Sequence, residues 1–159
     1  MGYEGERVTA RLARGCRCFV VRVDGAIAGY GWLSTGPEWI GELQLEITPR
    51  RREGYIWDCA TLVEHRRKGI FRSLLVGISE VARRDGLQRL WIGTIAIPAE
   101  KALEPAGFKL ALRFTSRRLL GWHMLRVTAA ADATLARAAR GVLEPRADLL
   151  LRRLERRVH

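Results

Sequence analysis

Residues 55–82, YIWDCATLVEHRRKGIFRSLLVGISEVA, predict a buried strand, a basic turn and an amphipathic helix. The first nine residues are apolar and rich in β-branched and aromatic side chains, as in a strand covered on both faces. Residues 64–68 are polar. After Gly69, apolar side chains recur at helical spacing, at Ile70, Leu74, Leu75, Ile78, Val81 and Ala82. A helix entered through glycine leaves its first backbone N–H groups without partners, so this turn is suited to bind a phosphate.

The turn contains the motif Arg66-Arg67-Lys68-Gly69-Ile70-Phe71. It resembles the Arg/Gln-x-x-Gly-x-Gly/Ala signature of the GNAT acyltransferase superfamily, which binds acetyl-CoA, and the flanking strand and helix fit that family. Phe71 stands where the family usually has a small residue. Its side chain therefore has to point away from the phosphates, or the turn has to open. The resemblance covers about residues 4–127 and includes Gly107-Phe108 after a short helix.

The composition is that of an ordinary globular chain, with 159 residues, 48% hydrophobic and 28% charged. No apolar run is long enough to predict a transmembrane helix, and the N-terminal residues lack the apolar region of a secretory signal. The three cysteines (Cys16, Cys18 and Cys59) are expected to be reduced in a cytoplasmic protein. No Cys/His cluster has metal-ligand spacing.

A net charge of +11 suggests an anionic partner, which is a nucleic acid, a membrane surface or a phosphate-bearing cofactor. The basic residues are spread along the whole chain and not gathered in one stretch. We therefore favour a cofactor site on a generally basic surface over dedicated nucleic-acid binding.

The other segments predict antiparallel hairpins on both sides of the central strand and helix. Asp24-Gly25 is typical of a hairpin turn, and Gly29 and Gly31 predict a bulge or a close backbone approach. The expected strands are residues 16–23, 26–34, 42–47, 87–97, 109–117 and 119–127, and the expected helices are 4–14 and 98–104, with a loop at 35–41. The fold class is a mixed, mostly antiparallel α/β sheet with a central parallel strand–helix–strand crossover, as the resemblance also implies (the acyl-CoA N-acyltransferase fold).

The N-terminal and C-terminal segments of the chain depart from the family pattern. Few residues precede the first strand, so the domain at residues 1–127 looks shortened at its N-terminus, and the strand at 16–23 is expected at an exposed edge. A homodimer that covers this edge is a hypothesis. Residues 128–159 predict a basic helical extension in two short helices separated by Pro145. It packs on the domain or on a dimer partner, or it is a membrane-surface or nucleic-acid arm.

The resemblance implies how acetyl-CoA is held. The backbone at the end of the strand (Cys59, Ala60 and Thr61) would pair with the pantetheine amides like an added strand, and the neighbouring strands would splay apart to admit it. The pyrophosphate would lie on the backbone of the turn, at Arg67, Lys68, Gly69, Ile70, Phe71 and Arg72. The alternative is a plain strand–turn–helix with solvated arginines.

Transfer to an amine requires loss of a proton from the alkylammonium, donors for the oxyanion and stabilisation of the leaving thiolate. The resemblance implies a backbone N–H near Ala60 as the donor. Many family members place a tyrosine acid four or five residues before Gly-Phe. Here Leu103 stands four residues before Gly107, so this acid is missing, water replaces it, or the thiolate leaves unprotonated.

Two carboxylates are candidates for the general base. Asp58 lies within an apolar strand, where a carboxylate is costly unless it is functional, paired with an arginine or bound to backbone groups. Glu46 lies on the preceding strand and faces either the cleft or solvent. Many relatives carry a base at the position of Tyr55, which does not serve readily at neutral pH. Trp32, Trp39, Tyr55 and Trp57 form either an aromatic acceptor pocket or core, and His65 and His123 are isolated.

We therefore expect an N-acetyltransferase that moves an acetyl group directly from acetyl-CoA to a small-molecule or peptide amine, without an acyl intermediate on Cys59. One alternative is a non-catalytic CoA-binding or regulatory module, which the short N-terminus and Leu103 favour. The other is a basic nucleic-acid-binding protein, which only the net charge suggests.

Overall fold

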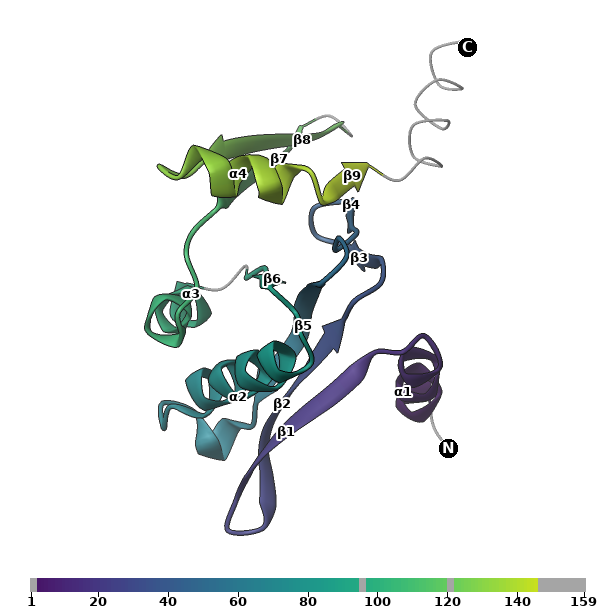
Figure 1. Ribbon diagram of the computed structural model, residues 1–159, viewed down its shortest axis with the longest axis vertical. Coiled ribbons are helices and arrows are strands. Elements are labelled where there is room, and N and C mark those ends of the chain that lie inside the picture. Colours follow the sequence, from purple (N-terminus) through teal and green to yellow (C-terminus); the bar gives the residue numbers. More distant parts are fainter. Residues whose placement is uncertain (1–2, 95–96, 120–121, 146–159) are drawn as a thin grey trace. The chain divides into compact units, whose positions relative to one another are not determined.

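The computed structural model describes residues 3–94, 97–119 and 122–145 (Figure 1). They belong to two compact units. The first comprises Met1–Gly36 and Pro49–Lys109, and the second comprises Pro37–Thr48 and Leu110–His159. The boundary expected after residue 127 lies inside strand β8 (Trp122–Ala129). The division into a domain at residues 1–127 and an extension at residues 128–159 stays a prediction.

The first unit contains a four-stranded sheet in the order β1-β2-β5-β6. β1, β2 and β5 are antiparallel, and β6 runs parallel to β5 after the crossover through α2. The predicted fold class, a mixed sheet with a central parallel crossover, is confirmed. The elements of this unit are α1 (Tyr3–Ala13), β1 (Arg17–Val23), β2 (Ala26–Ser34), β5 (Glu53–Thr61), η1 (Val63–His65), α2 (Ile70–Arg84), β6 (Arg89–Ile92), α3 (Ile97–Leu103) and η2 (Glu104–Ala106).

The second unit contains two small antiparallel sheets and one helix. One sheet has the order β3-β4-β9, and the other pairs β7 with β8. Helix α4 begins after Asp132, whose carboxylate accepts a hydrogen bond from the Leu135 N–H at 2.9 Å, the usual N-cap contact. The bounds are β3 (Glu38–Ile40), β4 (Leu45–Ile47), β7 (Leu112–Leu119), β8 (Trp122–Ala129), α4 (Ala133–Arg140) and β9 (Leu143–Pro145).

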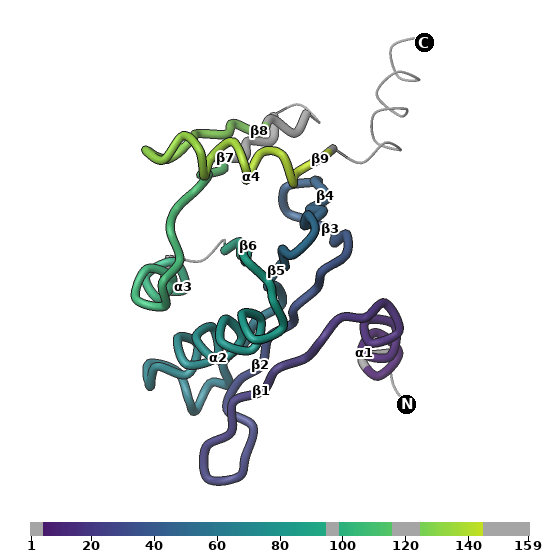
Figure 2. Tube along the Cα trace, viewed as in Figure 1, coloured from purple at the N-terminus to yellow at the C-terminus, as the bar shows by residue number. Residues whose placement is uncertain are grey.

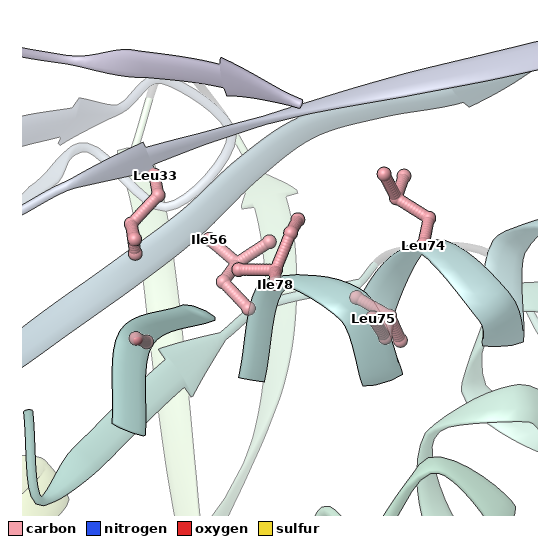
Figure 3. Packing of buried hydrophobic residues seen from close by; sticks show 6 residues of the cluster. Leu33, Ile56, Leu74, Leu75 and Ile78 are labelled. Atoms are coloured by element: carbon pink, nitrogen blue, oxygen red, sulfur yellow. The ribbon is translucent and has the colours of Figure 1, made fainter. Parts of the chain in front are cut away.

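The apolar face of α2 packs on the sheet and forms the core of the first unit (Figure 3). Leu33 of β2 and Ile56 of β5 meet the helix side chains Leu74, Leu75, Ile78 and Ala82, and each of the six is at most 3% exposed. Full burial of one such leucine or isoleucine stabilises the fold by about 1.5–3 kcal/mol. The core therefore fixes α2 on the sheet, and with it the turn that precedes the helix.

Helix α2 ends at Arg84, ahead of a left-handed glycine. Gly86 adopts φ 83°, in the left-handed region where only glycine is free of strain. Its N–H donates to the Arg83 carbonyl at 3.0 Å, and the Leu87 N–H donates to the Ala82 carbonyl at 2.9 Å. These two bonds are the Schellman pattern of a helix C-terminus.

Two of the predicted strands and one predicted loop were wrong in extent. The strand expected at residues 87–97 is only Arg89–Ile92, because Leu87 already packs on the core from the turn after α2 and α3 begins at Ile97. The loop expected at 35–41 contains β3. Of the strand expected at 42–47 only Leu45–Ile47 remains, because Gly41 to Gln44 turn the chain back on itself, with Gln44 at φ 53°.

The C-terminal extension was also predicted incorrectly around Leu143. This residue lies in β9 and not in a helix, because β4 offers a partner strand, with Ile47 opposite Leu143. The helix expected beyond Pro145 falls on residues 146–159, and the turn expected at Gly121 falls on residues 120–121. Both lie outside the described residues.

Strand β1 lies at the edge of its sheet, as the sequence predicts. The turn that joins it to β2 has φ 49° at Asp24 and 81° at Gly25, the left-handed pair typical of a tight hairpin. Val20 of β1 is 47% exposed. A homodimer that covers this edge stays a prediction, which light scattering at working concentration would check.

Candidate functional site

The turn before α2 presents backbone N–H groups to one side of the chain. Figure 2 follows the backbone from β5 through this turn into α2. Arg67 and Gly69 adopt left-handed conformations, with φ 60° and 77°. Gly69 is the N-cap and supplies no side-chain hydrogen bond. The first intrahelical bond runs from the Ser73 N–H to the Gly69 carbonyl at 3.0 Å, so the N–H groups of residues 70–72 have no intrahelical acceptor.

Positive charge surrounds these N–H groups. The four basic side chains of the turn and first helical residues, Arg66, Arg67, Lys68 and Arg72, are exposed. The Arg66 Nε donates to the Thr61 carbonyl at 3.5 Å, which ties the turn back to the end of β5. No acidic residue lies in the first turn of α2. N–H groups without intrahelical acceptors, the positive end of the helix dipole and basic side chains are the features that favour an anion at a helix N-terminus.

The side chains of Ile70 and Phe71 hold the turn against the protein. Ile70 is 8% exposed, and Phe71 packs against the core cluster of α2 and the sheet. The bulky Phe71 side chain therefore points into the protein and not toward the N–H groups. This is the first of the two arrangements expected from the sequence.

Half of β5 has one open backbone edge. β6 pairs with β5 only from Glu53 to Ile56, so the end of β5, with Cys59, Ala60 and Thr61, is paired with β2 alone among the described strands. Unpaired strand backbone is a template for an added extended chain. This edge leads directly to the turn before α2.

A bulge shapes the same part of β5. Between Tyr30 and Trp32 the register shifts, so that three steps along β5 match two along β2. Asp58 lies in the bulge at φ 45°, an uncommon conformation for a residue other than glycine. The bulge places Asp58 and Cys59 on opposite sides of the sheet, Asp58 toward α1 and Cys59 toward α2.

Two glycines of β2 make room for this bulge and for the start of α2, as the sequence predicts. A Cβ on Gly31 would lie 2.7 Å from the Cys59 Sγ. A Cβ on Gly29 would lie 2.9 Å from both the Ala60 carbonyl oxygen and the Ile70 Cγ2. Backbone at both positions is in direct contact with β5, so a larger residue would displace the strand end or the turn.

Cys59 is a poor nucleophile in this position. Burial, with a smaller contribution from the nearby Asp58 charge, raises the pKa of its thiol to about 12 from the usual 9.0. The raised pKa means that the neutral thiol stabilises the fold below pH 9, and that this contribution is lost as the pH rises toward 12. At pH 8 only about 10⁻⁴ of the Cys59 side chains are thiolate.

Thiol labelling should separate the three cysteines. Cys18 is exposed, whereas Cys59 is half-buried and Cys16 is buried. With a disulfide reagent at pH 8 we expect one fast phase, which Cys18→Ser removes and Cys59→Ser leaves in place, because the thiolate is the reactive form. A fast phase that disappears in Cys59→Ser would contradict the assignment.

Asp58 is paired and not alone. Its Oδ2 accepts a hydrogen bond from the Arg11 Nη1 of α1 at 2.6 Å, and its side chain is 40% exposed. Of the alternatives left open by the sequence, pairing with an arginine is the one found. A role for Asp58 as general base stays a prediction. Arg11 is 47 residues away in the chain, and no sequence pattern distinguishes it from Arg7 or Arg14.

The second candidate base lies in the second unit. Glu46 is on β4, opposite Trp39 of β3 and Glu144 of β9, and is half-buried. Trp39 belongs to the same unit and is 40% exposed. Of the aromatic residues considered for an acceptor pocket, the structure brings Trp32 and Trp57 together, with ring centroids 6.4 Å apart. Glu46 therefore stays a candidate from sequence alone.

Other candidate groups contribute less. Leu103 packs against the core cluster of the first unit, as a partly buried apolar side chain. The Nδ1 of His65 is buried without a hydrogen-bond partner among the described residues. Within residues 3–94, 97–119 and 122–145, no group of His, Cys, Asp or Glu side chains could hold a metal ion. In the same residues no helix is long and apolar enough to span a membrane.

Comparison with known proteins adds to this geometry. A sequence model of the Acetyltransferase (GNAT) family matches residues 3–108. A ribosomal-protein-alanine N-acetyltransferase from Brucella melitensis has a similar structure (TM-score 0.53, 17% identity, 80% of this chain and 76% of that chain). So does an acetyltransferase of Trypanosoma brucei (TM-score 0.52, 19% identity, 72% and 77%).

A third similar structure is aminoglycoside N-acetyltransferase AAC(6′)-Iy in complex with CoA (TM-score 0.51, 16% identity, 74% of this chain and 92% of that chain). At these identities the likeness shows a shared fold. A search of curated proteins found no match.

Proposed function

Because this chain belongs to the GNAT family of acetyltransferases, we propose that it transfers an acetyl group from acetyl-CoA to an amine. The observation that supports this most directly is the turn at residues 66–69, which leads from the open edge of β5 to the unpaired N–H groups of α2. An open strand edge and an anion site, next to each other on one chain segment, suit a cofactor with an amide-bearing arm and a pyrophosphate.

In this proposal the pyrophosphate lies on the backbone of Arg67, Lys68, Gly69, Ile70, Phe71 and Arg72. The pantetheine amides pair with the edge of β5 at Cys59, Ala60 and Thr61. The CoA complex of AAC(6′)-Iy supports an acyl-CoA as co-substrate. Acetyl-CoA is the form we expect, because the family is one of acetyltransferases.

Transfer is direct in this proposal. The neutral amine nitrogen attacks the thioester carbonyl, and the Ala60 N–H region stabilises the oxyanion. The C–S bond then breaks to release the CoA thiolate, and the proton that the new amide nitrogen loses passes to solvent. Cys59 forms no acyl intermediate, because its thiol stays protonated at neutral pH. Asp58 is the base that we favour, and it accepts a proton from the alkylammonium only when Arg11 no longer occupies its carboxylate. The free cysteines fit a reducing, cytoplasmic location.

A non-catalytic CoA-binding module is the second candidate. Two observations favour it: Leu103 supplies no acid for the thiolate, and Arg11 is bound to the Asp58 carboxylate. Such a module would bind CoA at the same site, but it would not transfer an acetyl group to an acceptor. Duplex DNA binding, suggested by the charge of +11, would instead show steep salt dependence and no response to CoA.

Calorimetric titration with acetyl-CoA, followed by thiol-release assays over a panel of amines, tests the proposals in turn. We expect a dissociation constant between about 1 μM and 1 mM, the usual range for enzyme substrates, and release of CoA with at least one amine class. Binding without release for any amine would favour the non-catalytic module. Absence of binding at millimolar acetyl-CoA would overturn both.

A further inference from the structure

Arg11 fills a site that is built to bind a cation. Its guanidinium carbon lies 4.4 Å from the ring centroid of Trp57 and 5.0 Å from that of Trp32. Its Nη1 lies 2.6 Å from the Asp58 carboxylate, and the arginine side chain is only 12% exposed. Two indole faces and a carboxylate around one cation are the elements of an aromatic cage. We call Trp32, Trp57 and Asp58 the cation cage.

The sheet holds the cage together. Trp32 of β2 and Trp57 of β5 are directly paired in the strand register, and their rings are inclined by 37°. Trp32 is 2% exposed. Asp58 follows in the bulge, at φ 45°, a strained conformation of a kind that recurs at ligand sites. The buried Trp57 Nε1 has no hydrogen-bond partner among the described residues, so the cage also contains an unused donor.

The occupant comes from a separate and weakly buried element. The apolar side chains of Val8 and Leu12 in α1 are 41% and 54% exposed. Burial of apolar surface therefore contributes little to holding α1 against the sheet. The helix joins β1 through Arg14 and Gly15, and Gly15 has φ 81°. Moving α1 away from the cage therefore costs less free energy than deforming the sheet that holds the cage.

We propose that the cation cage is the acceptor subsite and that Arg11 is an internal occupant which the acceptor replaces. The acceptor class is then an amine that carries a guanidinium or alkylammonium group able to stack on indole. Replacement of Arg11 also gives the Asp58 carboxylate a new partner, so acceptor binding brings the acceptor cation to the carboxylate in place of the Arg11 guanidinium. This inference rests on the proposed acetyl transfer for its biological meaning, whereas the cage itself is measurable without CoA.

The first test titrates N-methylguanidinium chloride into wild type and Arg11→Ala at constant ionic strength, followed by tryptophan fluorescence. If Arg11 occupies the cage more than nine-tenths of the time, its removal should tighten binding by at least about tenfold. Arg14→Ala, which removes the same charge from the turn that follows α1, should bind like wild type. The double variants Arg11→Ala/Asp58→Asn and Arg11→Ala/Trp57→Leu should lose the gained affinity.

A second measurement needs no substitution. The Arg11 guanidinium lies over two indole rings, so its Nε–H proton resonance should be displaced by ring currents in free wild-type protein. Saturating N-methylguanidinium should return this resonance to the position of a solvated arginine. Urea, a neutral molecule of similar shape, should leave it unchanged.

Three outcomes would overturn the inference: Arg11→Ala binds the probe no better than wild type, Arg14→Ala gains as much, or the resonance stays displaced while the probe saturates. If Arg11→Ala does not fold, the resonance experiment alone decides. Acetyl-CoA titration of the same samples keeps the two proposals apart. If the protein binds the probe but not acetyl-CoA, the proposed function is overturned and the cation cage is retained. If it binds acetyl-CoA but not the probe, only the cation cage is overturned.

Discussion

Gly69→Glu is expected to weaken acetyl-CoA binding by at least about 100-fold, which corresponds to about 2.7 kcal/mol. Two unit charges of like sign about 4 Å apart near a protein surface repel by about 4 kcal/mol, and the new carboxylate would stand at the N-cap of α2 beside the proposed pyrophosphate. The substitution also forces a side chain into φ 77°, at a cost of about 1–2 kcal/mol. Calorimetric titration of the purified variant measures the effect.

Gly77→Glu is the matched control. It adds the same charge to the same helix eight residues further on, which is about 12 Å along the axis and beyond the Debye length of about 8 Å at physiological salt. A Cβ at Gly77 meets no atom within 4 Å, so the change is tolerated sterically. We expect affinity for acetyl-CoA within about threefold of wild type.

Gly69→Ala separates the two causes, because it adds the strain without the charge. We expect a less stable protein that still binds acetyl-CoA, with affinity reduced by less than about tenfold, since the strain falls mainly on the fold. Equal affinities of wild type and Gly69→Glu would show that the turn before α2 is not the pyrophosphate site.

Glu53→Ala is expected to destabilise the protein by about 2–4 kcal/mol. The Glu53 side chain is 9% exposed and accepts three hydrogen bonds: from the Trp91 Nε1 at 2.8 Å, the Arg89 Nη1 at 3.0 Å and the Arg50 N–H at 3.3 Å. Removal leaves the Trp91 donor without its carboxylate, at a cost of about 1–3 kcal/mol. The Arg89 side chain is 42% exposed, so water compensates for part of its loss.

Thermal unfolding followed by circular dichroism measures this effect. At about 2–4 °C per kcal/mol for a chain of this size, the midpoint should fall by roughly 4–16 °C. Glu53→Gln keeps the shape and one acceptor oxygen, so its loss should be smaller. Glu80→Ala, an exposed position on α2, should change stability by no more than about 0.5 kcal/mol. If the unfolding midpoint of Glu53→Ala equals that of Glu80→Ala, the hydrogen bonds of Glu53 do not stabilise the fold.

Local pattern predicted the elements whose signal lies within one short stretch. The apolar spacing of α2 gave its buried residues, and five of the six apolar positions named are buried. Asp24-Gly25 predicted the hairpin, and Gly29 and Gly31 predicted the close backbone approach that is found with β5. The basic turn before Gly69 carries the motif that resembles the GNAT signature. The helix and the hairpin depend on contacts between near neighbours or on a conformation that glycine alone adopts freely, whereas the close approach depends on the missing Cβ of Gly29 and Gly31.

The strands that were mispredicted are short, and one of them depends on a distant partner. β3, β4 and β9 have three residues each, too few for an alternation to be recognised, and β9 is a strand because β4 lies about 100 residues earlier in the chain. β6 ends at Ile92 although the sequence remains apolar to Ile97. Apolar character predicts that a residue is buried, but the neighbour that it meets decides whether it lies in a strand or in a turn.

The stretch at residues 55–82 by itself predicted a strand, a basic turn and a helix, and it carried the resemblance to the GNAT family, because the strand, the glycine and the helical spacing all lie within it. Only the tertiary structure decided what faces Asp58. A carboxylate in a strand is compatible with solvent, an arginine or a substrate, and the sequence contains 28 lysines and arginines that could pair with it. The packing of α1 against the sheet selects Arg11, because it brings the Arg11 guanidinium to the Asp58 carboxylate from 47 residues away in the chain.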